Sequence, residues 1–207
     1  TATREARKPN FSMLSEVANE CFMPLAYGGG IRDIEDIKRI FGLGIEKVAL
    51  NSYAVENPSI VSKAAIEFGS QSILVSVDVR KTLLGKYHVC SHGGRQDSGY
   101  DPVRWATRME SLGAGEILLT SIDRDGTMEG YDLPLIRAVS SSVSIPVIAC
   151  GGAGNLNDLK IAVTEGGASA VAAGSMVVYQ AKSKGVLINF PDRGDLVDLF
   201  DEVEPHD

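Results

Sequence analysis

The chain has 207 residues, of which 44% are hydrophobic and 23% charged, a composition that excludes a disordered or fibrous protein and is typical of a globular one. Its 20 basic and 27 acidic residues give a formal net charge of −7, which argues against binding to nucleic acid or to an anionic membrane. No apolar stretch approaches the roughly 18 residues of a membrane span, and three widely spaced cysteines are typical of reduced thiols. We therefore expect a cytoplasmic protein without a metal ion or another cofactor.

Six short apolar runs alternate with helical patterns along the chain. The runs lie at residues 24–27, 48–50, 73–77, 117–119, 146–149 and 170–173. Between them, N-cap and N1 signals at Asp33, Asn57-Pro58 and Asp101-Pro102 predict helices that end near Gly42, Gly69 and Gly113. Strands that are apolar on both faces and alternate with helices predict a parallel sheet covered by helices.

An internal repeat indicates a closed barrel rather than an open sheet. "MPLAYGGGI" (23–31) is similar to "IPVIACGGAG" (145–154), and "GIEKVALNS" (44–52) is similar to "GASAVAAGS" (167–175). Pro24 and Pro146 are 122 positions apart (146 − 24), and Ser52 and Ser175 are 123 apart (175 − 52). The sequence therefore predicts an α/β fold, a (β/α)8 TIM barrel of two half-barrels.

The same offset leaves the strands at 73–77 and 117–119 without counterparts in this chain. We therefore expect roughly 50 residues, which carry the first strand, first helix and second strand of a typical (β/α)8 barrel, to be missing before Thr1. Residues 1–192 are interpreted as a single barrel domain, incomplete at its N-terminus, and residues 193–207 as an acidic C-terminal tail.

Glycine-rich segments follow four of the predicted strands, at the barrel end where active sites lie. They are Gly28-Gly29-Gly30, Asn51-Ser52, Gly151-Gly152-Ala153-Gly154 and Gly174-Ser175. Glycines let backbone N–H groups approach an anion closely, so the duplicated pattern predicts two phosphate sites and a bis-phosphorylated ligand. The alternative interpretation is that these glycines only form tight turns between strands and helices.

Acidic residues also end two predicted strands. Asp78 ends the strand in "ILVSVDVR", where a general acid or base belongs; the alternative is an aspartate that caps the next loop. Asp125-Gly126 is predicted to position a ligand, while Asp123 and Arg124 are predicted to pair with each other.

Charged residues begin two strands at the opposite end of the barrel. Lys47 and Glu116 form either a stabilising ion pair or a gate at the bottom of the barrel interior. His88 and His92 lie in a predicted hairpin after Asp78, and without further ligands nearby we expect no metal there.

Several motifs carry a resemblance to a known family: "YGGGIR", "EKVALNS", "ENPSIV", "IPVIACGGAGN", and "DRDGT" followed by "GYD". They make the chain similar, up to about Tyr179, to the cyclase (HisF-type) subunit of imidazole glycerol phosphate synthase. The resemblance implies a (β/α)8 barrel with a glutaminase (HisH-type) subunit docked at its bottom as the source of ammonia. It also implies the reaction of that family. Ammonia and a bis-phosphorylated ribulosyl formimino-aminoimidazole carboxamide ribonucleotide become imidazole glycerol phosphate and an aminoimidazole carboxamide ribonucleotide.

The resemblance also implies a role for individual residues. Asp78 matches a catalytic aspartate, Lys47 and Glu116 match part of an ammonia gate, and Glu46 matches a position that faces the glutaminase. The implied phosphate- and substrate-binding residues are Gly30, Asn51 and Ser52 for one phosphate, Gly152, Gly174 and Ser175 for the other, and Asp125 and Gly126 for the substrate.

Three segments, "KPNF", "CFMPLAYGGG" and "KGVLINFP", resemble a HisF-like paralogue associated with surface polysaccharide. The chain also departs from the cyclase family at several positions. Tyr27 replaces a small aliphatic residue and is expected to crowd the barrel mouth, Cys150 replaces Ser, Gly174 replaces Ala, and "KSKGVLINFPDRGD" is expected to lack a closing helix. In that branch the barrel and its glutaminase supply ammonia to a sugar amidotransferase that makes acetamidino sugars. Two alternatives to a cyclase therefore stay open, a non-cyclising ammonia conduit and a phosphosugar isomerase, and "DRDGT" with "GYD" disfavours the isomerase.

Overall fold

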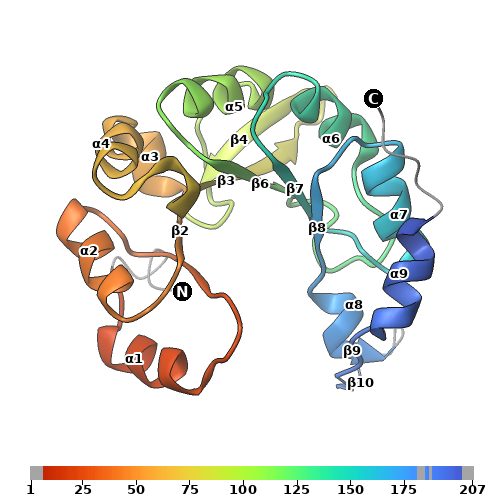
Figure 1. Cartoon of the computed structure of the whole chain (residues 1–207). Helices are drawn as coiled ribbons and strands as arrows, with labels where there is room; N and C mark the ends of the chain where they lie inside the picture. The colour runs from red at the N-terminus through yellow and green to blue at the C-terminus, as the bar shows by residue number, and fades with distance from the viewer. Residues whose placement is uncertain (1–6, 181–184, 187, 202–207) are drawn as a thin grey trace.

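A computed structural model describes residues 7–180, 185, 186 and 188–201. Six parallel strands form a curved sheet in the order β1-β2-β3-β6-β7-β8, with helices along its outer side (Figure 1). The parallel strands are β1 (Ala26–Gly28), β2 (Lys47–Leu50), β3 (Ile73–Lys81), β6 (Glu116–Ser121), β7 (Val147–Cys150) and β8 (Ala170–Ala172). The helices are α1 (Phe11–Glu20), α2 (Ile34–Gly42), α3 (Ser52–Glu56), α4 (Ser59–Phe68), α5 (Pro102–Ser111), α6 (Leu133–Ser140), α7 (Leu156–Thr164), α8 (Ser175–Val178) and α9 (Arg193–Asp201), with a 3-10 turn η1 (Ser70–Ser72).

The predicted strands are confirmed, since each of the six apolar runs lies in or overlaps one of the parallel strands. The predicted hairpin after Asp78 is confirmed, since β3 pairs antiparallel with β4 (Tyr87–Ser91), but β3 continues farther beyond the apolar run, to Lys81. A short β5 (Gln96–Asp97) pairs with β4. The remaining strands, β9 (Tyr179–Gln180) and β10 (Gly185–Val186), pair with each other.

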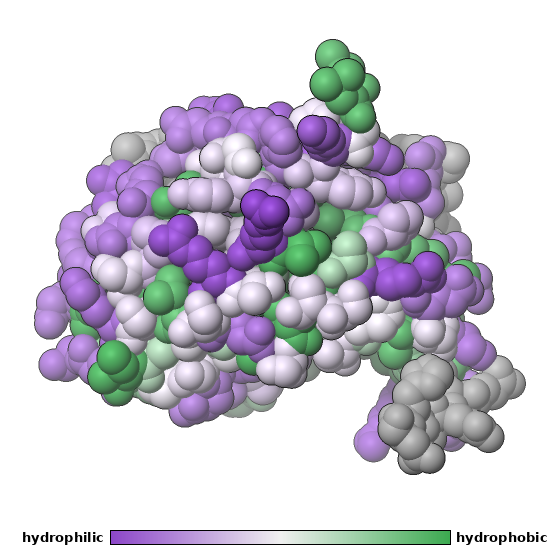
Figure 2. Space-filling view, turned by 90° about the horizontal axis from the view of Figure 1, so that it is seen from above, coloured by the Kyte–Doolittle hydropathy of each residue, from purple (hydrophilic) through white to green (hydrophobic). Residues whose placement is uncertain are grey.

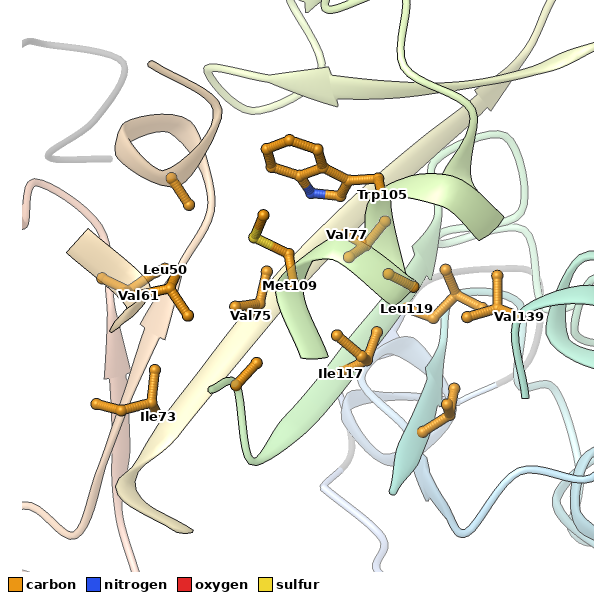
Figure 3. Close-up of a cluster of buried hydrophobic side chains, with 14 of the residues drawn as sticks. Leu50, Val61, Ile73, Val75, Val77, Trp105, Met109, Ile117, Leu119 and Val139 are labelled. Atoms are coloured by element: carbon orange, nitrogen blue, oxygen red, sulfur yellow. The ribbon is translucent and has the colours of Figure 1, made fainter. Parts of the chain in front are cut away.

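Alternation of side chains along each strand separates a helix-facing side from an inner side of the sheet. Val75 and Val77 of β3 are fully buried beneath Trp105 and Met109 of α5, beside Ile117 of β6 (Figure 3). Each such side chain contributes roughly 1.5–3 kcal/mol of hydrophobic stabilisation. The core thus lies between sheet and helices and fixes the direction of every residue on the inner side.

The outer surface is mostly hydrophilic with scattered apolar residues, as the view from above shows (Figure 2). Within the described ranges, no helix is both long and apolar enough to cross a membrane.

The same alternation corrects the expectation for Tyr27. Tyr27 lies opposite the fully buried Val48 in the β1–β2 register and packs against the hydrophobic core, whereas its neighbours Ala26 and Gly28 line the inner side. Tyr27 therefore does not crowd the mouth of the barrel.

The internal repeat is reproduced by the helices. Helices α2 and α7 begin at Ile34 and Leu156, 122 positions apart, and both have nine residues. The short helices α3 and α8 begin at Ser52 and Ser175, 123 positions apart. The two repeated segments therefore fold as equivalent blocks, which agrees with the predicted half-barrel organisation.

The C-terminal segment forms a helix where the sequence predicted none. Helix α9 contacts α7, and its residues Leu196, Leu199 and Phe200 pack against the core. These apolar residues recur at helical spacing between acidic ones. The interpretation of residues 193–207 as an acidic tail rested on charge and did not consider this spacing. The division of the chain at residue 192 and the expectation of further strands before Thr1 stay predictions.

Candidate active site

A cavity of about 450 Å³ lies at the carboxyl ends of β1, β2 and β3. Its wall includes the glycine-rich loop after β1, the start of α3, the inner side of β3 and the turn after β4. The polar and glycine residues in this wall include Gly28, Gly29, Gly30, Arg32, Asn51, Ser52, Glu56, Ser76, Asp78 and His92. The structure thus brings together four predicted site residues, Gly30, Asn51, Ser52 and Asp78.

Asp78 is a largely buried carboxyl group on the inner side of β3. Burial raises the pKa of Asp78, a hydrogen bond from Ser76 Oγ to Asp78 Oδ1 at 2.9 Å opposes the rise, and the charge of Asp125 adds to it. A carboxyl group with a raised pKa holds a proton nearer to neutral pH than an ordinary aspartate. Asp78 is therefore suited to give and take a proton inside the cavity.

Asn51 and Ser52 lie where β2 ends and α3 begins. Ser52 Oγ donates to Asn51 Oδ1 at 3.4 Å and accepts the backbone N–H of His92 at 2.8 Å. The Asn51 amide is close enough to Asp78 to oppose the rise of its pKa. However, the buried Asn51 Nδ2 has no hydrogen bond of normal geometry within the described residues. Such a donor costs about 1–3 kcal/mol when left unsatisfied, so a ligand oxygen here would be stabilised.

An acidic residue fixes the glycine-rich loop in each block. Asp36 Oδ2 accepts the backbone N–H of Arg32 at 3.2 Å, and Asp158 Oδ2, 122 positions later, accepts that of Gly154 at 2.9 Å. Gly30 is buried with φ of 73°, in the left-handed region that favours glycine. The loop after β1 is thus held in one conformation beside the cavity.

The equivalent loop after β7 has a different environment. Gly152 has φ of 112°, and a Cβ there would collide with the carbonyl oxygen of Gly130. The N–H of Gly130 in turn donates to the carbonyl of Gly152 at 2.8 Å. The tight-packing alternative therefore explains why position 152 is glycine.

Ser175 lies in the second block, with Gly174 and Gly126 nearby. A Cβ on Gly126 would be 3.8 Å from Ser175 Oγ, and a Cβ on Gly174 would meet no atom within 4 Å. Neither these residues nor Gly152 line the cavity that contains Asp78.

Asp123 and Arg124 do not form the predicted pair. Asp123 Oδ2 accepts the backbone N–H of Lys81 at 2.8 Å, and its Oδ1 lies 4.0 Å from Arg80 Nε. Arg124 instead donates to the carbonyl of Glu129 at 3.1 Å. The hairpin that extends β3, which the sequence did not predict at this length, brings Arg80 and Lys81 to Asp123.

Cys150 ends β7 with its thiol close to the same mouth. Burial raises the pKa of Cys150, the Thr120 side chain opposes the rise, and the charges of Asp125 and Asp78 add to it. The thiolate is the nucleophilic form of cysteine, so this environment disfavours Cys150 as a nucleophile.

Lys47 and Glu116 lie on the inner side at the opposite end of the strands. Lys47 Nζ forms an ion pair with Glu116 Oε1, from β2 to β6 across the intervening β3. Both side chains are only partly exposed, at 35% and 22%. Glu46 is exposed next to this pair.

His92 is the cavity residue whose position the sequence did not indicate. Forty residues separate His92 from Ser52, and only the β3–β4 hairpin brings them together. His88, on the same hairpin, instead has its Nδ1 2.8 Å from Asp97 Oδ2. Across the part of the chain that the structure describes, no three His, Cys, Asp or Glu side chains could share a metal ion.

The parallel α/β barrel wall and the cavity at its strand ends define the class of barrel proteins with a site at the carboxyl end of the sheet. The family model described as "Histidine biosynthesis protein" matches residues 1–184, and the chain belongs to this family.

Curated relatives place the chain more narrowly. A Pseudomonas aeruginosa protein provisionally named imidazole glycerol phosphate synthase subunit hisF2 is 46% identical over 191 residues, which cover 92% of this chain and 76% of that protein. A Leptospira interrogans protein provisionally named subunit HisF of the same synthase is 45% identical over 201 residues, which cover 97% of this chain and 79% of the relative. A Leptospira borgpetersenii protein with the same provisional name is 43% identical over 201 residues, with the same coverage. The chain is therefore HisF-like at the level of the family.

Proposed function

We propose that this chain is a HisF-type cyclase subunit that uses ammonia to convert the bis-phosphorylated formimino ribonucleotide into imidazole glycerol phosphate and an aminoimidazole carboxamide ribonucleotide. The observation that carries the proposal is the position of Asp78. Its largely buried carboxyl group lies in one cavity with Gly30, Asn51 and Ser52, so an acid or base adjoins a group of backbone and hydroxyl donors.

Asp78 serves as the acid or base of this reaction. Addition of ammonia and closure of an imidazole ring require protons to be removed from nitrogen and returned to a leaving group, which a positioned carboxyl group accelerates. Ser76 orients the carboxyl group from two residues away on the same strand. Because burial raises the pKa of Asp78, its carboxyl group keeps a proton to a higher pH than an ordinary aspartate does.

Two groups of residues bind the phosphates of the substrate in this proposal. Gly30, Asn51 and Ser52 form the first cradle, and the buried Asn51 Nδ2, which makes no hydrogen bond of normal geometry within the described residues, supports it. The second cradle consists of Gly152, Gly174 and Ser175, with Asp125 and Gly126 as substrate contacts between the cradles. The proximity of Gly126 to Ser175, and the influence of Asp125 on the pKa of Asp78, support this arrangement.

Ammonia enters from the opposite end of the barrel, where we place a glutaminase of the HisH type. Lys47 and Glu116 act as a gate on this route, and the exposed Glu46 contacts the glutaminase. The support is geometric, since the Lys47–Glu116 ion pair spans the inner side of three neighbouring strands at that end.

Two observations favoured the conduit alternative, namely Tyr27 at the barrel mouth and a tail without a closing helix. The first does not hold, because Tyr27 packs toward the helices and not into the mouth. The second is weakened by the presence of helix α9. The conduit is therefore one outcome of the test and not a second proposal.

Growth of a histidine auxotroph that lacks its cyclase subunit tests the proposal. In ammonium-rich medium, where no glutaminase partner is required, the full-length protein, with any residues that precede Thr1, is expected to restore growth and its Asp78→Asn variant is not. Failure of the unmodified full-length protein, when it accumulates normally in the cells, would reject cyclisation and favour the conduit.

A further inference from the structure

We propose that His92 completes the first phosphate cradle. Its backbone N–H fixes the Ser52 hydroxyl, and its imidazole donates a hydrogen bond to a phosphate monoester. This inference rests on the phosphate binding proposed above for Gly30, Asn51 and Ser52, and it names a residue from outside the repeated blocks as part of that site.

The backbone of His92 is held in an unusual conformation that serves Ser52. His92 has φ of 55°, a left-handed value that is uncommon outside glycine, and its N–H points at Ser52 Oγ from 2.8 Å. A serine oxygen that accepts this bond keeps its own proton for donation, and that proton is directed at Asn51 Oδ1 over a long 3.4 Å contact. The contact with His92 thus fixes the Ser52 hydroxyl at the cavity wall, where a phosphate oxygen can take the place of Asn51 Oδ1 as its acceptor.

The imidazole of His92 lies between two oxygen atoms at the edge of the cavity. Nε2 is 3.3 Å from Glu56 Oε1, and Nδ1 is 3.1 Å from Oγ of the buried Ser91. Ser91 holds the ring from the protein side, while the Glu56 side chain is 53% exposed and can turn into solvent. The ring is therefore anchored on one side and has an exchangeable partner on the other.

The charges around the cavity explain why a phosphate needs this ring. The acidic groups in its wall are Asp78 and Glu56, and the basic groups are Arg32 and His92. A phosphate group that enters replaces Glu56 as the anionic partner of the imidazole, because a phosphate binds cationic donors more strongly than a mobile, solvated carboxylate does. Glu56 is then a competitor of the phosphate and not a part of the cradle.

A purely mechanical role for His92 makes a different prediction. If the His92–Glu56 contact only holds the turn after β4 against α3, loss of either side chain weakens phosphate binding. If the imidazole donates to the phosphate, loss of His92 weakens phosphate binding and loss of the Glu56 charge strengthens it. The opposite signs separate the two roles.

The test is a titration of the full chain with inorganic phosphate, monitored by NMR through the backbone amide chemical shifts of Gly29, Gly30 and Ser52. The variants are His92→Asn, Glu56→Gln and His88→Asn. Asparagine tolerates the left-handed conformation and keeps the N–H to Ser52, so His92→Asn removes the imidazole alone. His88→Asn is the matched control, since His88 pairs with Asp97 on the same hairpin and does not line the cavity.

We expect the dissociation constant for phosphate to rise about tenfold in His92→Asn, as for the loss of one hydrogen bond to a charged group. It should fall in Glu56→Gln and stay unchanged in His88→Asn. Equal affinity in His92→Asn and the unmodified chain, or weaker binding in both His92→Asn and Glu56→Gln, would overturn the inference.

The same titration separates this inference from the proposed function. Phosphate-dependent shifts at Gly29, Gly30 and Ser52 in a protein that fails to cyclise the ribonucleotide leave the role of His92 standing and reject the cyclase. Absence of any shift at these amides in the unmodified chain rejects the phosphate cradle, and with it both proposals.

Discussion

The two repeated blocks of the chain have nearly the same backbone plan and different surroundings. Residues 26–56 and 147–178 each run from a strand through a glycine-rich loop, a nine-residue helix and a second strand to a short helix that begins with serine. In the first block the loop faces a cavity of about 450 Å³ that also contains Asp78. In the second block Gly152 packs against Gly130 of the preceding loop. Equivalent motifs therefore do not imply equivalent sites.

The segments inserted between the blocks cause this difference. The β3–β4 hairpin brings His92 over Ser52 in the first block, whereas the loop at residues 122–132 lies against the glycines of the second. Tyr87 of the hairpin also donates to Asp132 Oδ1 at 2.9 Å, which joins the hairpin to the end of that loop. The first block is thus predicted to hold the reacting end of the substrate, and the second only to anchor it.

The largest expected effect concerns Asp78, which adjoins the first block. Asp78→Asn should lower kcat with ammonium salt by about 10²–10⁴-fold, as expected when a general acid or base is lost. Asp123→Asn is the control, because Asp123 binds the Lys81 backbone at the base of the hairpin and does not line the cavity. Similar losses of kcat in both variants would mean that Asp78 has no special role.

Glycine substitutions in the second block test its packing role. Gly152→Ala should lower the free energy of unfolding by about 3 kcal/mol, because the new methyl group meets the Gly130 carbonyl and the left-handed φ disfavours alanine. The melting temperature should fall by roughly 6–12 °C for a chain of this size. Gly174→Ala, with open space around it and φ of −113°, should change stability by less than about 0.5 kcal/mol. Equal stabilities of the two variants would refute the packing difference.

The serines that begin α3 and α8 offer the sharpest matched pair. Ser52→Ala should raise KM about tenfold, since it removes a donor from the cavity wall and leaves the His92 N–H without its acceptor. Ser175→Ala should raise KM only about threefold, because no described backbone N–H donates a hydrogen bond to Ser175 Oγ. The reverse order, measured by steady-state kinetics with ammonium salt, would show the second block to be the principal anchor.

The smallest effect is on the pH dependence of stability. Burial raises the pKa of folded Asp78 above its unfolded value of 3.8, so the folded state binds a proton more tightly than the unfolded chain. As pH falls from 7 through the raised pKa toward 3.8, the free energy of unfolding of the unmodified chain should therefore rise relative to that of Asp78→Asn. Denaturant unfolding at several pH values measures the difference, and a change of the opposite sign would contradict the burial of a proton-binding group.

The sequence predicted the six parallel strands, the main helices and the repeat because apolar runs, caps and glycines are local signals. Asp33 and Asp101 illustrate this, since each caps its helix within three residues, at Asp36 N and Arg104 N. The position of Asp78 at the end of an apolar run likewise indicated that it belongs to the site. These features need no knowledge of contacts between distant parts of the chain.

Distant contacts explain what the sequence did not predict. The direction of Tyr27 follows from its register with Val48, the partners of Asp123 follow from the extended hairpin, and His92 reaches Ser52 only through that hairpin. The unequal glycine loops also depend on a contact, that of Gly152 with Gly130. Each of these errors therefore arose where a residue's role is decided by a neighbour far away in sequence, whereas α9 was missed although its apolar spacing is a local signal.

The central claim is that the cavity beside the first block carries out cyclisation. Incubation of the full-length protein, including any residues that precede Thr1, with the bis-phosphorylated formimino ribonucleotide and ammonium salt, followed by separation of the products, tests it most directly. The account predicts equal amounts of imidazole glycerol phosphate and the aminoimidazole carboxamide ribonucleotide. Folded protein that binds phosphate at Gly30 and Ser52 yet forms neither product would contradict it.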